Sequence, residues 1–347
     1  MHLRSATNLL RARGEHYDGK VNFVELFFDL VFVFAITQLS HTLLQHFTLT
    51  GILKTTLLFL AVWRVWIATT WVTNWLDPQD TRVQLMLFTL MLAGLFMSMS
   101  IPNAYEDGGL GFAVAYAFMH VGRSLFMVWA VAGHSPQKYA LFRAMTSWLL
   151  LAGIFWVVGA IVHGEWRVVL WVIALMIEYL APAAGFWTPR LGRAPSAQWD
   201  ISGVHMAERC GLFVIICLGE SILLTGANFA KMPWTVVTMG AFVIAFVGTV
   251  AIWRVYFYIG HDRASHLIDH SPDPGRIARL WFTYIHIPIV AGIILIAASD
   301  ELLLAHPTGH VSTDAAIVLL GGPALFLLGA LWLKLASSST PPWPHGV

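Results

Sequence analysis

Charged residues are scarce in this chain. Only 11% of its 347 residues are Asp, Glu, Lys or Arg, whereas 58% are hydrophobic, and the mean hydropathy is +0.70. Because a soluble domain carries about a quarter charged residues, this composition excludes an ordinary soluble protein and indicates a polytopic membrane protein whose main partner is the lipid bilayer. The net charge of +1 gives no basis for nucleic-acid binding.

Cysteine and the sequence signatures of common enzymes are also lacking. Cys210 and Cys217 are the two cysteines, and seven residues of helix separate them by about 10 Å, which is too far for a disulfide. No P-loop, dinucleotide fingerprint, G-x-S-x-G or CxxC motif occurs. The sequence therefore does not favour a familiar enzyme and identifies no cofactor. The polar first twenty residues lack the apolar core of a signal peptide, so we expect the first apolar segment to be retained.

Long apolar runs fill most of the chain. A membrane-spanning helix needs about 20 mostly apolar residues, and the turn-rich gaps between the runs are too short for a soluble domain. The sequence predicts an all-α, polytopic transmembrane helix bundle of about ten spans, at residues 21–44, 53–71, 83–101, 110–132, 139–162, 166–186, 205–226, 236–259, 279–299 and 315–335.

The placement of lysine and arginine predicts the orientation. Four of them lie in the N-terminal tail, and most others fall in alternate loops, starting with Arg82 and Lys138. Cytoplasmic loops carry an excess of these residues. We therefore expect a multi-pass protein of the cell membrane with a cytoplasmic N-terminus.

A weak internal repeat is also present. AVWRVW (61–66) recurs as AIWRVY (251–256), and LAGLF (92–96) as VAGII (290–294). The first four predicted helices therefore resemble the seventh to tenth, which predicts parallel repeats of the kind found in two-halved transporters. The expected organisation is a cytoplasmic tail (1–20), a six-helix repeat (21–186), a cytoplasmic linker (187–204), a four-helix repeat that is shorter than the first (205–335) and a C-terminal tail (336–347).

Ten acidic and arginine side chains fall inside the predicted spans. Each costs about 2.5–3.5 kcal/mol near the centre of a membrane helix, so such residues normally face inward and pair. By depth we expect Glu25 or Asp29 to pair with Arg64, and Glu208 with Arg254. Nearly all of the set falls in the cytoplasmic half of its span, which predicts one polar cavity reached from the cytoplasm. The ten residues are Glu25, Asp29, Glu178, Glu208, Glu220, Arg64, Arg123, Arg143, Arg209 and Arg254.

Other side chains add to this pattern. Histidine titrates near neutral pH and suits proton relay or metal binding, but no two histidines have the ligand spacing of a known motif. The many tryptophans, such as Trp63, Trp66, Trp71 and Trp75, are predicted to be interfacial anchors, and Pro288 is predicted to bend or break its helix. The candidate substrate or ion pathway comprises Glu25, Asp29, Arg64, His120, Arg123, Glu178, His205, Glu208, Arg209, Glu220, Ser221, Arg254 and His286.

Two stretches resemble a known family. VELFFDLVFVFAITQLSH (24–41) and ERCGLFVIICLGESILLTG (208–226) are similar to the two signatures of the bacterial low temperature requirement A family. The resemblance implies a multi-pass inner-membrane protein connected with growth in the cold, and it brings no established reaction or substrate. The matching positions are Glu25, Asp29, Glu208, Arg209, Gly219, Glu220 and Ser221. The C-terminus is shorter than the form expected from the family, which leaves open whether the chain is complete.

Three hypotheses for function follow. The first is a secondary transporter or proton-coupled permease in which carboxylates carry a proton or cation and arginines hold an anion. The second is a membrane redox or metal protein that uses the intramembrane histidines. The third is a non-transporting membrane component needed for growth in the cold. The sequence identifies neither the solute nor the oligomeric state.

Overall fold

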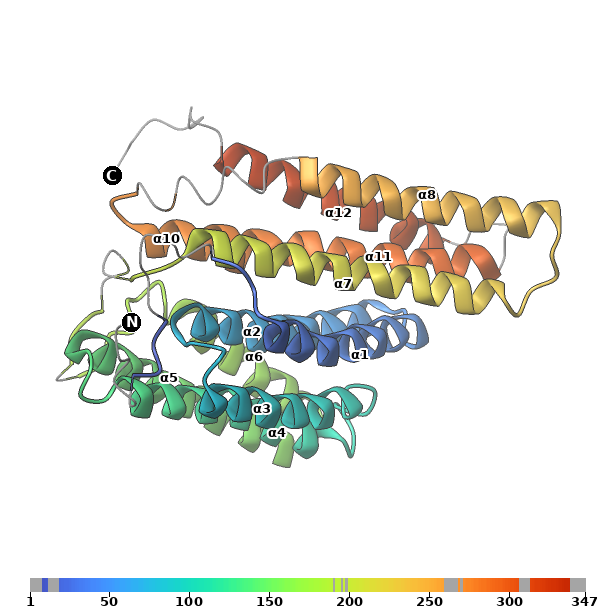
Figure 1. The fold of residues 1–347 in the computed structure, drawn as a ribbon. Coiled ribbons are helices and arrows are strands. Elements are labelled where there is room, and N and C mark those ends of the chain that lie inside the picture. The colour runs from blue at the N-terminus through green and yellow to red at the C-terminus, as the bar shows by residue number, and fades with distance from the viewer. Residues whose placement is uncertain are drawn as a thin grey trace.

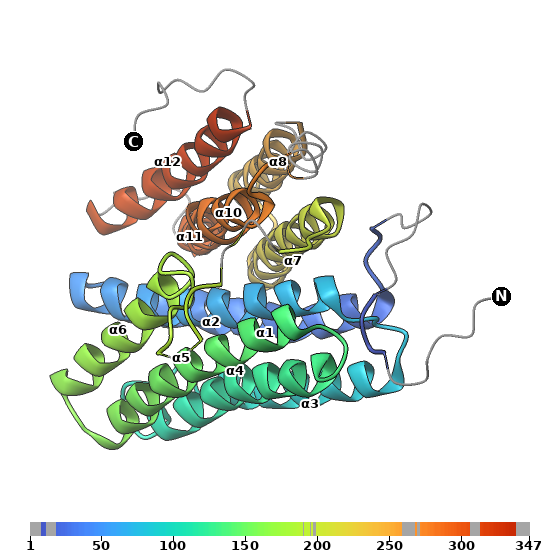
Figure 2. The same ribbon diagram turned by 90° about the vertical axis from the view of Figure 1, so that its left-hand side faces the viewer.

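The chain folds into two layers of helices that pack side by side (Figures 1 and 2). The computed structural model describes residues 8–11, 19–189, 191–194, 196, 199–258, 268, 271–305 and 313–337. Of the two predicted tails, residues 1–7, 12–18 and 338–347 lie outside this range. In the described part of the chain, nine helices are long and apolar enough to cross a membrane, and a tenth, α6, has 16 residues. The predicted all-α polytopic bundle is confirmed.

The first layer contains six helices. In it α1 packs against α2 and α3, α3 against α4, and α5 against both α4 and α6. Helix α2 lies at the centre of the molecule and is the most buried of the membrane-length helices. The helices are α1 (Phe23–Gln45), α2 (Leu49–Trp75), α3 (Thr81–Met99), α4 (Gly109–Val131), α5 (Pro136–Ile161) and α6 (Glu165–Leu180).

The second layer follows a similar packing order. Helix α7 packs against α8 and α11, and α11 packs against α12. A repeat of the first four helices requires this order, although the repeat itself stays a prediction. The elements are α7 (Gly203–Phe229), α8 (Val236–Tyr258), α10 (Pro274–Ala278), the π-helix η2 (Arg279–Ile285), α11 (His286–Ala305) and α12 (Thr313–Ala336).

Two helix ends differ from the predicted spans. Helix α6 ends at Leu180 rather than at residue 186, because Pro182 cannot extend it and because Gly185 and Phe186 have positive φ angles of 63° and 50°. Helix α11 instead continues through Ala305. Asp300 and Glu301, which the sequence placed beyond the span, are therefore helical.

Pro288 does not break its helix. Elements α10, η2 and α11 form one continuous span (Pro274–Leu304). Proline has no N–H to offer the carbonyl four residues before it, and the wider π-helical turn ends just before this position. The imidazole Nδ1 of His286 lies 2.7 Å from the carbonyl oxygen of Trp281. The predicted disturbance of the backbone therefore takes the form of a π-helical segment, a feature often found at functional sites.

Close approach of α11 and α12 depends on glycine. A Cβ added at Gly292 would lie 2.5 Å from the backbone nitrogen of Phe326, and one at Gly329 would lie 2.7 Å from the side chain of Ile289. Small residues let membrane helices pack tightly where lipid gives no hydrophobic driving force. We infer that these glycines hold α12 against the rest of the layer.

Replacing Gly292 by Ala is therefore expected to lower the free energy of unfolding by about 1–3 kcal/mol, the usual cost of overpacking. Thermal unfolding of the purified protein in detergent measures this. Gly240→Ala and Gly248→Ala are matched controls, because an added Cβ meets no atom within 4 Å at either position. Both should be neutral or slightly stabilising, since alanine is the better helix former. Equal behaviour of all three variants would contradict the packing role.

Candidate functional site

Glu25 has a local role at the start of α1. Asn22 is the N-cap residue, and its side chain accepts a hydrogen bond from the amide of Val24. The carboxylate of Glu25 accepts one in return from the amide of Asn22 at 2.9 Å. Together they form a capping box, in which two helix-end groups satisfy each other. The Asn-x-x-Glu spacing before an apolar run is a sequence signal for this role.

The same carboxylate joins three separate parts of the chain. Arg11, from the segment before α1, donates to Glu25 Oε2 at 2.9 Å, and His205 Nε2 of α7 lies 2.8 Å from Oε1. Arg11 also donates to the carbonyl oxygens of Thr73 and Leu76 at the end of α2. Glu25 is fully buried and therefore fastens the N-terminal segment, α2 and α7 to α1.

Asp29 and Arg209 form a second buried connection, one turn deeper. The Arg209 guanidinium donates to both carboxylate oxygens of Asp29, at 2.8 and 2.7 Å, and to the carbonyl oxygen of Glu25 at 2.7 Å. Trp66 of α2 donates its indole N–H to Asp29 Oδ1 at 2.8 Å. Both charged residues are 0% exposed. A bidentate pair of this kind is strong and geometrically specific, and it ties the two layers together.

These contacts correct the predicted pairings. Asp29 pairs with Arg209 of α7 rather than with Arg64, because Arg64 lies on another side of α2, where it faces Glu178. Glu208 does not reach Arg254; its carboxylate caps the amide of Val21 at 2.9 Å. Arg254 is exposed on α8, above the ring of Tyr258, and Arg143 is likewise exposed, near the ring of Tyr139.

A second cluster of charge lies on the opposite side of α2. Glu178 of α6 accepts hydrogen bonds from the Tyr116 hydroxyl and from the Trp156 indole. Its Oε2 atom lies 4.0 Å from Arg64 Nε and 3.6 Å from His120 Nε2. All of these side chains are buried. Glu178 is therefore the carboxylate that faces Arg64.

Arg123 of α4 is buried beside this cluster without a carboxylate of its own. Its guanidinium donates to the hydroxyl of Thr69 at 2.9 Å and lies 3.0 Å from Nδ1 of His120. The charge of Arg64 is close enough to act on it. Two like charges in a low-dielectric site repel each other, so one carboxylate, Glu178, has to compensate for two arginines.

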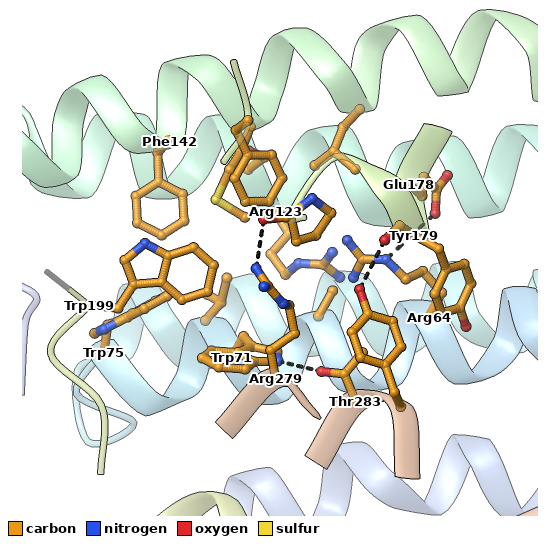
Figure 3. Close-up of a pocket in the computed structure, with 18 residues that line it drawn as sticks. Arg64, Trp71, Trp75, Arg123, Phe142, Glu178, Tyr179, Trp199, Arg279 and Thr283 are labelled. Atoms are coloured by element: carbon orange, nitrogen blue, oxygen red, sulfur yellow. Dashed lines mark hydrogen bonds and ion pairs between the residues drawn. The ribbon is translucent and has the colours of Figure 1, made fainter. Parts of the chain in front are cut away.

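A cavity opens next to these arginines, between the two layers (Figure 3). The cavity extends to the end of the bundle at which the segment after α6 lies. Its volume is about 660 Å³ when the space at its open mouth is included. The centre of a water molecule can occupy about 50 Å³ of it, which is room for a few waters. The charged residues in its lining are Arg64, Arg123, Arg279 and Glu178. Among the described residues of the lining, three arginines and one carboxylate give a formal charge of +2.

The rest of the cavity wall is largely aromatic. Trp71, Trp75 and Trp199 line it together with Phe142 and Tyr179 (Figure 3). Trp71 and Trp75, like Trp63 and Trp66, are at most 8% exposed. The prediction that these four tryptophans are interfacial anchors is therefore wrong, because this part of α2 lies inside the bundle and contacts protein instead of lipid.

The π-helical segment forms the wall that the second layer contributes. Arg279, Thr283 and Tyr284 line the cavity, and Arg279 donates to the carbonyl oxygen of Pro182 at 2.6 Å. Trp71 donates its indole N–H to the Thr283 hydroxyl at 3.1 Å (Figure 3). Just beyond, His286 is hydrogen-bonded to the Tyr256 hydroxyl at 2.9 Å. The cavity is thus closed by a segment whose backbone departs from a regular α-helix.

A third polar region lies toward the other end of the bundle. Glu220 Oε1 accepts from the Thr37 hydroxyl of α1, and the Ser221 hydroxyl lies 3.4 Å from Asp300 Oδ2 of α11. All but Thr37 are buried. Neither this region nor the Asp29–Arg209 pair borders the arginine cavity. The expectation of one common cavity is therefore wrong: most of the predicted residues fall into three groups, Arg254 and His286 lie outside them, and of the predicted residues only Arg64, Arg123 and Glu178 line the cavity.

Several important residues escaped the sequence analysis. Arg279 stood at the first position of the predicted span 279–299, Arg11 lay in the polar N-terminal tail, and Asp300 lay just beyond the predicted span. Arg11 carries no sequence signal, because its position depends on how the N-terminal segment folds back on α2. Arg279 carried one signal, its place less than three turns before Pro288. Among the residues the structure describes, no group of three or more His, Cys, Asp or Glu side chains is placed to hold a metal ion.

Comparison with known proteins places this chain in a family. The model of the bacterial low temperature requirement A protein matches residues 20–347. An uncharacterized protein of Rhizobium meliloti (strain 1021), RA0937, is 43% identical over 327 residues, which are 94% of this chain and 80% of the relative. No solved structure matches. With the apolar helices of the fold, these matches show that the chain is an integral membrane protein of the bacterial low temperature requirement A family.

Proposed function

We propose that this protein is a permease for a small organic anion, which binds in the arginine cavity between the two layers. The observation that carries the proposal is the charge of the lining, in which, among the described residues, Arg64, Arg123 and Arg279 face one carboxylate, that of Glu178. Buried charge inside a membrane protein is costly and is a functional-site hypothesis by default. An anionic solute would supply the missing negative charge.

The chemistry of the lining supports an organic anion in particular. A guanidinium group offers paired N–H donors that match a carboxylate or phosphate. The aromatic side chains of Trp71, Trp75, Trp199 and Phe142 offer apolar surface to the rest of the solute. Sites for small molecules commonly combine mostly apolar walls with a few fixed polar groups.

The position of the cavity supports transport rather than binding alone. One wall comes from α2, α4 and α6, and the other from η2 in the second layer. Transporters commonly bind their solute between two halves that move relative to each other. With the orientation expected from the loop charges, the mouth of the cavity faces the cytoplasm.

Binding of benzoate to the purified protein tests the proposal, with tryptophan fluorescence as the readout because three tryptophans line the cavity. We expect saturable binding of benzoate and much weaker binding of its neutral analogue benzamide. Arg279→Gln should weaken benzoate binding about tenfold, which corresponds to about 1.4 kcal/mol. Arg279 is suited to this test because it is only partly buried.

Arg254→Gln is the matched control, since it removes the same charge from an exposed position on α8. It should leave benzoate binding unchanged. Uptake of radiolabelled benzoate into proteoliposomes then separates transport from binding. Equal affinity for benzoate and benzamide, or equal effects of the two substitutions, would overturn the anion site.

A further inference from the structure

Glu220 and Asp300 are buried carboxylates without a cationic partner. Glu220 is 4% exposed and Asp300 is 7% exposed, and neither forms an ion pair with any residue that the structure describes. Their side-chain partners are hydroxyl groups: Thr37 Oγ1 lies 2.5 Å from Glu220 Oε1, and Ser221 Oγ lies 3.4 Å from Asp300 Oδ2.

This arrangement differs from the other buried carboxylates of the bundle. Glu25, Asp29 and Glu178 each lie within 4.0 Å of an arginine nitrogen. An ionised carboxylate without such compensation is expensive in a membrane interior. Glu220 and Asp300 therefore require another source of positive charge, which a bound proton or small cation would provide.

An independent observation points to a ligand at the same place. Ser40 of α1 is 0% exposed, and its hydroxyl has no hydrogen-bond partner within the described part of the chain. Serine and threonine in helices commonly donate to the carbonyl four residues earlier, as Thr37 and Thr42 do here. Ser40 does not. Thr37, three residues before Ser40, contacts Glu220 of α7. Leu43, three residues after Ser40, belongs to one hydrophobic cluster with Ala298 of α11. Residues three apart share a helix face, so Ser40 faces α7 and α11.

Thr37 gives a second indication. Its hydroxyl lies within hydrogen-bond distance of both the Val33 carbonyl oxygen, at 3.0 Å, and the Glu220 carboxylate. A hydroxyl has a single proton to donate. When that proton goes to Val33, the contact with Glu220 is favourable only if the carboxyl group brings a proton or a cation binds to both oxygens.

We propose that Glu220 and Asp300, with the hydroxyls of Thr37, Ser40 and Ser221, form a binding site for a small monovalent cation, H⁺ or Na⁺. The donors are all oxygen atoms, which suits a hard cation. Among the described residues, His41 on α1 and Cys217 on α7 lie close enough to Glu220 to interact with it electrostatically, and Glu301 follows Asp300 on α11. Cation binding here stands on its own, whereas its use to drive anion uptake rests on the proposed function.

Thermal unfolding of the purified full chain tests whether the site binds Na⁺. Replacing choline chloride by NaCl at constant ionic strength should raise the unfolding temperature by about 2–4 °C at saturating Na⁺. Glu220→Gln and Asp300→Asn should abolish the rise, and Ser40→Ala should weaken the apparent affinity several-fold. Ser40→Ala removes only a hydroxyl and so remains informative if a carboxylate variant fails to fold.

Infrared spectroscopy tests whether the site holds H⁺ instead. If the site holds H⁺, Na⁺ has no effect, and Glu220→Gln and Asp300→Asn each remove part of the band of protonated carboxyl groups at neutral pH. Ser98→Ala and Glu165→Gln are matched controls, because Ser98 donates to its own helix at Gly94 and Glu165 is exposed. Both control variants should behave as the unmodified protein does in the Na⁺ experiment and in the infrared experiment.

The outcomes separate this site from the anion site. Loss of the cation response in Glu220→Gln with unchanged benzoate affinity supports a distinct cation site. A cation response in a protein that binds no benzoate rejects the proposed function and leaves the cation site standing. The absence of both a Na⁺-dependent shift and any change in the carboxyl band would overturn the cation site.

Discussion

Replacing Arg209 by Gln is expected to lower the free energy of unfolding by about 3–5 kcal/mol, because it leaves the charge of Asp29 buried and uncompensated. Arg209 makes both hydrogen bonds of the bidentate pair and also holds the carbonyl oxygen of Glu25. Of these contacts, glutamine can replace at most one. Because α1 and α7 belong to different layers, the substitution should also loosen the contact between the layers.

A double substitution shows whether this effect arises from the ion pair. In Asp29→Asn with Arg209→Gln no charge is left unpaired, so the double variant should recover a substantial part of the stability, and the pair should show a large coupling energy. Arg143→Gln is the control, since Arg143 is exposed near Tyr139. Unfolding by heat or denaturant in detergent measures the unmodified protein, both single variants, the double variant and the control. A loss in the single variant no larger than that of Arg143→Gln would contradict a structural role for the pair.

Replacing Glu178 by Gln is expected to have two opposite effects. It should lower the free energy of unfolding by about 3–5 kcal/mol, because it removes the carboxylate that faces Arg64 in the buried cluster. It should also strengthen benzoate binding, because the formal charge of the cavity lining rises from +2 to +3. We expect a gain in affinity of about tenfold, or about 1.4 kcal/mol.

Benzoate should therefore restore part of the stability lost in Glu178→Gln, because a ligand that binds only the folded state stabilises it by mass action. The unfolding temperature with and without benzoate measures this. Glu208→Gln is the matched control: Glu208 is half-buried, caps Val21 and does not line the cavity. A benzoate affinity that falls in Glu178→Gln would show that Glu178 helps to hold the anion instead of opposing it.

The three groups of buried charge have different chemistry, and this guides the choice between the functional hypotheses. The Asp29–Arg209 pair is fully buried and joined by two hydrogen bonds, which favours a structural role for the residues that stand out most in the sequence. His205 and His286 give little support to a redox or metal site, because both ring nitrogens of each are engaged in protein contacts. The arginine cavity has an excess of charge that the protein does not satisfy, and it is the feature on which the permease proposal depends.

The helices of this protein could be predicted from the sequence, whereas most contacts of the candidate site could not. Apolar length determined the spans, because a helix is the simplest way for a chain to satisfy its backbone groups in lipid. Pro182 and Pro288 marked where regular helix would be disturbed. The capping box of Asn22 and Glu25 was also readable, because it depends on residues three apart.

The partners of the buried charges were decided only by the tertiary structure. Arg64 and Arg254 stand in nearly the same local sequence, WRV in both cases, yet one is 7% exposed beside Glu178 and the other is exposed on α8. Helix α2 is enclosed on both sides and α8 is not. The sequence by itself determined that these side chains enter the membrane and need compensation, because solvation and helix length are local properties. Which charges meet, and which remain unsatisfied around a cavity, depends on how helices distant in sequence pack, because an ion pair forms only between side chains within a few ångströms.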